Sequence, residues 1–179
     1  APSWAPSDLW QGHGPSDTGV ALDANTEPRS YWSIPADGTR REHLERHRFS
    51  GFSNTIAEPA HLRQMAMAWL ANFDRWHADV WRLDILGDRL SHWLIHDHTL
   101  TDGADEVFVQ HWRRALRRQA RHLLRWAHKP RPGDDPMPAL QGAIMAALAF
   151  PEYSNRLKIN LAALTTEIEG SVVALREEG

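Results

Sequence analysis

The sequence of 179 residues contains no cysteine, which excludes disulfide bonds, cysteine-ligated zinc and a thiol nucleophile. It also has little excess of either charge, because 20 Lys and Arg residues stand against 23 Asp and Glu residues, for a formal net charge of -3. The chain as a whole is therefore not expected to be attracted to nucleic acid or to an anionic membrane. Any binding to a polyanion must come from a local patch.

Long apolar runs are missing as well. No stretch approaches the roughly 18 apolar residues of a membrane helix, so no membrane contact is expected. Residues 1–4 show neither the basic start nor the apolar middle of a signal peptide. The loops that bind nucleotides and the Gly-x-Ser-x-Gly motif of serine hydrolases are absent too. No cofactor is expected.

The first 58 residues predict an irregular N-terminal segment, because Pro, Gly, Ser and Asp cluster there without a sustained period. Short strands around residues 31–34 and 46–49 are an option. The segment is expected to pack on its neighbour through seven apolar side chains. They are Trp4, Trp10, Tyr31, Trp32, Ile34, Phe49 and Phe52.

From residue 59 the apolar spacing becomes helical. Helices are predicted over residues 59–73, 84–100, 104–128, 139–150 and 154–178, with a proline-rich linker over 130–138. Short connections and hardly any strand signal predict an all-α fold of antiparallel helical hairpins, arranged as a bundle or a toroid. The chain thus divides into an irregular part, 1–58, and a helical part, 59–179.

The predicted helix 84–100 carries one candidate site. Arg89, His92 and His96 project within roughly 60° of one another at 100° per residue. The i, i+4 spacing of the two histidines is compatible with metal binding, but neither a Glu partner nor a third ligand is indicated. In the other two interpretations, these side chains lie on a solvated polar flank of the helix or line a substrate cleft. No metal is assigned.

The predicted helix 104–128 has an arginine-rich face opposite its apolar side. Like charges at i, i+4 repel one another, so an anionic neighbour or ligand is expected nearby. The last helix offers Glu167, Glu169, Glu177 and Glu178 as neighbours, and an acidic glycan or a nucleic acid is the alternative. The face consists of Arg113, Arg114, Arg117, Arg118, Arg121 and Arg125.

Tryptophan is the other abundant side chain, with nine residues. Trp69, Trp93 and Trp112 fall on apolar helical faces and are expected in the core. Trp76 and Trp81 lie in the predicted loop 74–81 and are expected to be accessible. Since indole faces stack on sugar rings, these two are candidate ligand contacts.

Residues 76–94 follow the pattern W-x(n)-W-x-x-D-x-x-G-x-R-L-x-x-W-L. This pattern resembles that of heparinase II/III-like proteins of bacteria. Residues 102–108 and 118–123 resemble the next helix of that family. Leu9-Trp10-Gln11-Gly12 resembles its N-terminal L-W-x-G segment, although His13 stands where the family has an acid.

This resemblance implies the N-terminal part of an (α/α) toroid, followed in the parent protein by more helices and a C-terminal β-sandwich domain. It also implies a polysaccharide lyase, periplasmic in this family, that cleaves acidic (uronic-acid) glycans by β-elimination. In such enzymes an Asn, Gln, His or Arg neutralises the uronic carboxylate, a base removes the adjacent proton, and Tyr or His protonates the leaving oxygen. No catalytic residue is transferred, although Tyr153 and Asn155 have suitable side chains.

The leading hypothesis is therefore that this chain is the helical part of such a lyase, incomplete as an enzyme. Its expected partner is an acidic polysaccharide, and its candidate substrate-binding residues are Arg89, His92, His96, Trp76 and Trp81. The alternative is a non-catalytic helical binding or scaffold module that uses the arginine-rich face for an acidic partner.

Overall fold

A computed structural model describes residues 27–33, 39–54, 58–129 and 135–177, and every regular element in these ranges is a helix. The predicted all-α class is confirmed. The strands considered for the N-terminal region are wrong, because Tyr31 ends α1 (Pro28–Tyr31) and Arg46 ends α2 (Arg40–Arg46). Trp4, Trp10 and Ile34, expected as apolar anchors, lie outside the described residues, as does the segment 9–12.

A capping box starts α2. The hydroxyl of Thr39 accepts a hydrogen bond from the backbone N of Glu42 at 3.2 Å, and the Glu42 carboxylate accepts one from the backbone N of Thr39 at 2.9 Å. These bonds satisfy amide groups that have no partner within the helix. The Thr-x-x-Glu signal is therefore the local reason for a helix in a region that was expected to be irregular.

The first predicted helix is confirmed as α3 (Pro59–Phe73). The single helix predicted over 84–100 is wrong, because the backbone leaves the helical conformation at His96, with φ -93° and ψ 7°. Two helices result, α4 (Leu83–Ile95) and α5 (Asp97–Thr101).

Two of the remaining helices, α6 and α7, begin at capping residues. α6 (Glu106–Trp126) follows Asp105, whose carboxylate accepts a hydrogen bond from the backbone N of Phe108 at 2.8 Å. α7 (Pro136–Ala149) begins earlier than predicted, because Pro136 tolerates the first helical position and Asp135 caps it. The 3₁₀ helix η2 (Pro151–Arg156) precedes α8 (Leu157–Glu177), which therefore starts later than predicted.

Tryptophan side chains form the centre of the core. Trp69, Trp93 and Trp112 are fully buried, as predicted, with ring centres 5.1 Å apart for the first pair and 4.4 Å for the second. Trp32 is also buried, and its Nε1 donates to the carbonyl oxygen of Met65 at 2.9 Å. The end of α1 is thus packed on α3.

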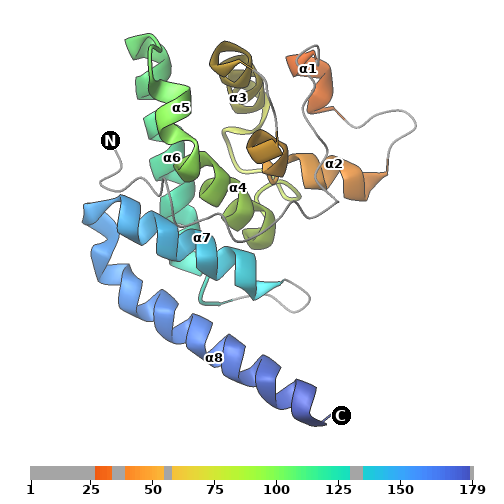
Figure 1. Ribbon diagram of the computed structural model, residues 1–179, viewed down its shortest axis with the longest axis vertical. Helices are drawn as coiled ribbons and strands as arrows, with labels where there is room; N and C mark the ends of the chain where they lie inside the picture. Colours follow the sequence, from red (N-terminus) through yellow and green to blue (C-terminus); the bar gives the residue numbers. More distant parts are fainter. Residues whose placement is uncertain (1–26, 34–38, 55–57, 130–134, 178–179) are drawn as a thin grey trace.

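Glycine allows α4 and α7 to lie in close contact (Figure 1). A Cβ added at Gly87 would lie 2.1 Å from the carbonyl oxygen of Pro138, and one at Gly142 would lie 2.5 Å from the carbonyl oxygen of Gly87. Any larger residue would force the two backbones apart.

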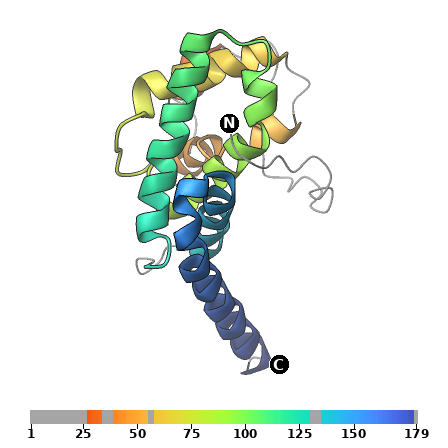
Figure 2. The ribbon, with the colours of Figure 1, turned by 90° about the vertical axis from the view of Figure 1, so that its left-hand side faces the viewer.

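The last helix leads away from the others, with only its N-terminal part beside α7 (Figures 1 and 2). Several apolar side chains on it are exposed, among them Ile168, Val172 and Val173. Within the described ranges, no helix is long and apolar enough to cross a membrane.

Candidate functional site

Arg89, the first predicted site residue, lies in the core. It has no exposed surface, and it donates to Oε1 of Gln119 at 2.8 Å and to the carbonyl oxygens of Val80 and His47 at 2.9 and 3.2 Å. Its guanidinium lies 4.4 Å from the ring centre of Trp69, and burial lowers the pKa of Arg89 to about 9. Arg89 therefore holds parts of the fold together and has no surface for a ligand.

His92 and His96 are half-buried and line none of the cavities described below. Nδ1 of His92 lies 2.8 Å from the carbonyl oxygen of Asp88 and 3.0 Å from that of Arg48, so this nitrogen carries the hydrogen. Burial, and then the adjacent His92, lower the pKa of His96 to about 4. No group of three or more His, Asp or Glu that could hold a metal occurs in the described part of the chain.

Trp76 and Trp81 are brought together in a pocket of about 290 Å³, here called the tryptophan pocket. Trp76 is 68% exposed, but Trp81 is only 6% exposed, which corrects the expectation that both are freely accessible. Nε1 of Trp81 donates to the carbonyl oxygen of Phe73 at 2.9 Å and so fixes that indole. The other lining residues are Ala78, Arg82, Leu83, His122, Trp126 and Lys129.

Two arginines of the arginine-rich face of α6 form ion pairs with acidic residues. Arg118 forms an ion pair with Asp74, after α3, and Arg117 forms one with Glu152 in η2, with Nε and Oε1 3.2 Å apart. The expected partners on the last helix do not take part, since Glu167 and Glu169 form no ion pair with it. Glu177 and Glu178 lie outside the residues whose side chains are described. Three exposed arginines of this face, Arg114, Arg121 and Arg125, have no ion pair among the described residues.

Two of these arginines line a second cavity, of about 590 Å³, here called the arginine pocket. Arg156 adds a third guanidinium, and Glu152, the acid of the pocket, is already paired with Arg117. The pocket therefore carries positive charge that the described residues do not balance. It is lined by Arg121, Leu124, Arg125, Glu152, Tyr153, Asn155 and Arg156.

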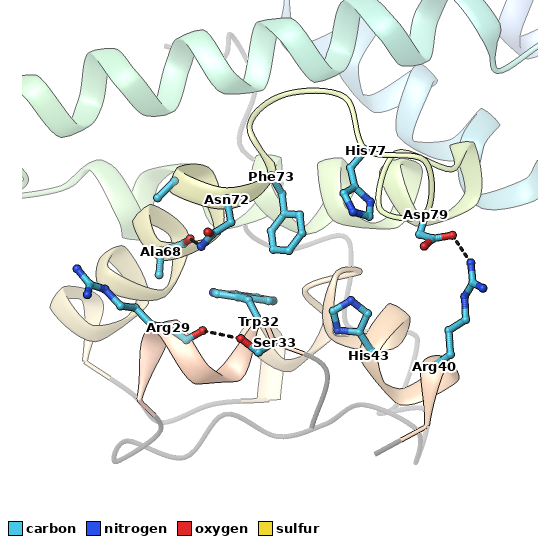
Figure 3. Close-up of a pocket in the computed structure, with 11 residues that line it drawn as sticks. Arg29, Trp32, Ser33, Arg40, His43, Ala68, Asn72, Phe73, His77 and Asp79 are labelled. Atoms are coloured by element: carbon cyan, nitrogen blue, oxygen red, sulfur yellow. Dashed lines mark hydrogen bonds and ion pairs between the residues drawn. The ribbon is translucent and has the colours of Figure 1, made fainter. Parts of the chain in front are cut away.

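The largest of the three cavities described here, of about 1080 Å³, is called the histidine cavity (Figure 3). Figure 3 shows His43 and His77 facing each other at one end, beside the ion pair of Arg40 and Asp79. Arg29 lies at the other end. The remaining lining residues are Trp32, Ser33, Ala68, Ala71, Asn72 and Phe73.

A chain of hydrogen bonds with a fixed direction ends at this cavity. Because the indole Nε1 of Trp69 can only donate, Nδ1 of His47, 2.8 Å away, accepts. A neutral His47 then carries its hydrogen on Nε2 and donates it to Nε2 of His43 at 3.2 Å. His43 carries its own hydrogen on Nδ1, which is buried and has no partner in the described structure.

His43 and His47, the two histidines of this series of hydrogen bonds, are both held in the neutral form. Burial, and then the guanidinium of Arg89, lower the pKa of His47 to about 2. Burial and the nearby Arg46 also lower the pKa of His43, against the opposing effect of Asp79. At neutral pH the cavity is therefore lined by the neutral imidazole of His43, together with the guanidiniums of Arg29 and Arg40 and the carboxylate of Asp79.

The pair His43 and His47 was not predicted as a site from the sequence, although it has the same i, i+4 spacing as His92 and His96. The spacing brings side chains together only within a helix. The capping box at Thr39 is the signal that places the second pair in a helix.

No model of a known protein family matches the chain, and neither curated proteins nor solved structures give a significant match. The function is therefore inferred from the side chains that line the three cavities.

Proposed function

We propose that this chain is the helical part of a heparinase II/III-like polysaccharide lyase, built as part of an (α/α) toroid, and that the histidine cavity holds an acidic sugar unit. One observation carries the proposal. The cavity gathers two guanidiniums, two imidazoles and a side-chain amide, which are donors suited to a sugar carboxylate and its hydroxyls. They belong to Arg29, Arg40, His43, His77 and Asn72.

The chemistry explains why such donors matter. In β-elimination the C5–H bond of the uronic unit breaks and the proton goes to a base. A C4–C5 double bond forms as the C4–O bond breaks, and the leaving oxygen takes up a proton. Developing negative charge on the carboxylate is stabilised by guanidinium or neutral N–H donors. Arg29 and Arg40, whose guanidiniums line the cavity, are the groups that we propose for this role.

Binding and turnover test the proposal separately. Oligogalacturonates are titrated into the chain by calorimetry, with neutral maltooligosaccharides as controls. Unsaturated uronic products are followed by ultraviolet absorbance with the parent protein, because the chain itself is expected to be incomplete as an enzyme. Arg40→Gln is expected to weaken oligogalacturonate binding by about tenfold, the effect of one charge-assisted hydrogen bond. Its exposed ion pair with Asp79 contributes little to stability.

Arg41→Gln provides the matched control, because Arg41 is the exposed neighbour on α2 and does not line the cavity. It is expected to leave binding unchanged. Equal affinity for neutral and acidic oligosaccharides, or equal effects of the two variants, would contradict the proposal.

A second candidate function rests on Arg114, Arg121 and Arg125, which lack ion pairs among the described residues. In this alternative the chain is a non-catalytic module that binds an acidic partner through α6. Its affinity for a polyanion should fall steeply with salt, and the parent protein should form no unsaturated product. Loss of that affinity in Arg121→Glu, with oligogalacturonate binding in the histidine cavity absent, would favour this alternative.

A further inference from the structure

The tryptophan pocket and the arginine pocket share the C-terminal end of α6. His122 and Trp126 line the first, whereas Arg121 and Arg125 line the second. At about 100° per residue these two i, i+4 pairs occupy adjacent faces of the helix. The guanidinium of Arg125 lies 5.2 Å from the ring centre of Trp126, so the two pockets meet at this contact.

The tryptophan pocket offers surfaces that suit a sugar ring. Trp76 is 68% exposed and Trp126 is 42% exposed, which is unusual for side chains of this size. The buried Trp81 also lines the pocket, with the ring of His122 edge-on and the two ring centres 5.4 Å apart. Aromatic faces with a cation at the rim, here Lys129, bind a ring that carries an acid group.

The arginine pocket carries three guanidiniums that no acidic side chain of the described residues pairs with. Arg121, Arg125 and Arg156 form no ion pair with any described residue, while Glu152 is held by Arg117. Repulsion between neighbouring guanidiniums favours an anion at this place. Tyr153 and Asn155 add hydrogen-bonding groups that fit hydroxyls.

We propose that an anionic oligosaccharide lies across the C-terminal end of α6, with one ring on Trp76 and Trp126 and further acid groups on Arg121, Arg125 and Arg156. The choice of an acidic sugar as ligand rests on the proposed function. The residues involved line neither end of the histidine cavity, so this is a second binding site on the same chain.

NMR titration of the full chain tests this site directly. The indole N–H signals of Trp76 and Trp126, assigned through Trp76→Ala and Trp126→Ala, report on this site and not on the histidine cavity. A short and a long oligogalacturonate are both expected to shift them. The double variant Arg121→Gln/Arg156→Gln is expected to weaken the long ligand about tenfold and the short one little.

Arg114→Gln is the matched control, because Arg114 is an exposed, unpaired arginine of α6 that lines neither pocket. It should change neither affinity. Polyglutamate serves as a polyanion without sugar rings. If it binds as tightly as the long oligogalacturonate without moving the indole signals, the site binds acidic protein or charge alone, and the inference is wrong.

The failures of the two proposals can be told apart. If the indole signals stay in place while Arg40→Gln still weakens oligogalacturonate binding, the second site is refuted and the proposed function stands. If the indole signals shift while Arg40→Gln has no effect, the second site stands without the histidine cavity. If no oligogalacturonate binds at all, both proposals are refuted.

Discussion

The indole Nε1 of Trp69 donates a hydrogen bond to Nδ1 of His47 over 2.8 Å, and both side chains are fully buried. This contact sets the tautomer of His47 and, through it, that of His43. A core tryptophan therefore decides which nitrogen of a cavity histidine carries a hydrogen. The packing of Trp69 in the core therefore affects the hydrogen-bonding groups of the histidine cavity.

Trp69→Phe is expected to destabilise the fold by about 2–4 kcal/mol, because it leaves Nδ1 of His47 without a donor, opens a space in the core and leaves Arg89 a smaller ring to stack on. Urea unfolding measures the loss. NMR of the labelled imidazoles should show that His47 no longer keeps a single tautomer. Trp126→Phe, at an exposed position, is the control and should change stability by less than about 0.5 kcal/mol. If His47 keeps the same tautomer in Trp69→Phe, the indole of Trp69 does not set the direction of these hydrogen bonds.

Stability should fall as the solution is acidified. The folded-state pKa of His47 is about 2 and that of His96 about 4, against 6.5 for an unperturbed histidine. Below pH 6.5 the unfolded state takes up protons that the folded state does not, so each group contributes stability that is complete above 6.5. This contribution is lost as pH falls toward the folded-state value.

The expected slope is up to about 1.4 kcal/mol per pH unit for each such histidine. Urea midpoints measured between neutral pH and pH about 4 test it. His96→Gln should flatten the slope over that range. A midpoint independent of pH in the native chain would contradict the neutral state of both histidines.

The sequence was sufficient where a long helix repeats its apolar face. The core positions Trp69, Trp93 and Trp112 follow from helical periodicity alone, because burial of one face of a helix depends only on local spacing. The same reasoning fails for α2, because this short helix is stabilised by its capping box and by packing and not by a repeated apolar face. It also fails at His96, where a predicted single helix divides into α4 and α5.

The residues that form the candidate sites were harder to predict from the sequence, because the sites depend on contacts between segments that are distant in the chain. Trp76 and Trp81 were selected, but their partners Trp126 and His122 come from α6. Arg89 resembles a ligand-binding residue in sequence, yet its acceptors Gln119 and His47 on other elements hold it in the core. No local pattern distinguishes a buried arginine from an exposed one.

The close contact of α4 and α7 gives a matched pair of glycine substitutions. Gly87→Ala should cost about 2 kcal/mol or more, because its Cβ would lie 2.1 Å from a backbone oxygen of Pro138 that no side-chain rotation can move. Gly170→Ala in α8, where nothing lies within 4 Å, should stabilise by about 0.5–1 kcal/mol through helix propensity. Both are measured by urea unfolding, and equal effects would show that α4 and α7 do not pack this closely.

Arg89 provides the decisive comparison between a ligand contact and a structural role. Arg89→Lys keeps a positive charge but cannot reproduce the planar group that bonds Gln119, Val80 and His47 and stacks on Trp69. We expect a loss of about 3 kcal/mol or more in unfolding free energy, since buried acceptors lose their donors. Oligogalacturonate affinity, measured at a temperature where the variant remains folded, should stay within about twofold of the native value because the guanidinium has no exposed surface. A stable Arg89→Lys variant with lost affinity would instead place Arg89 in a ligand site.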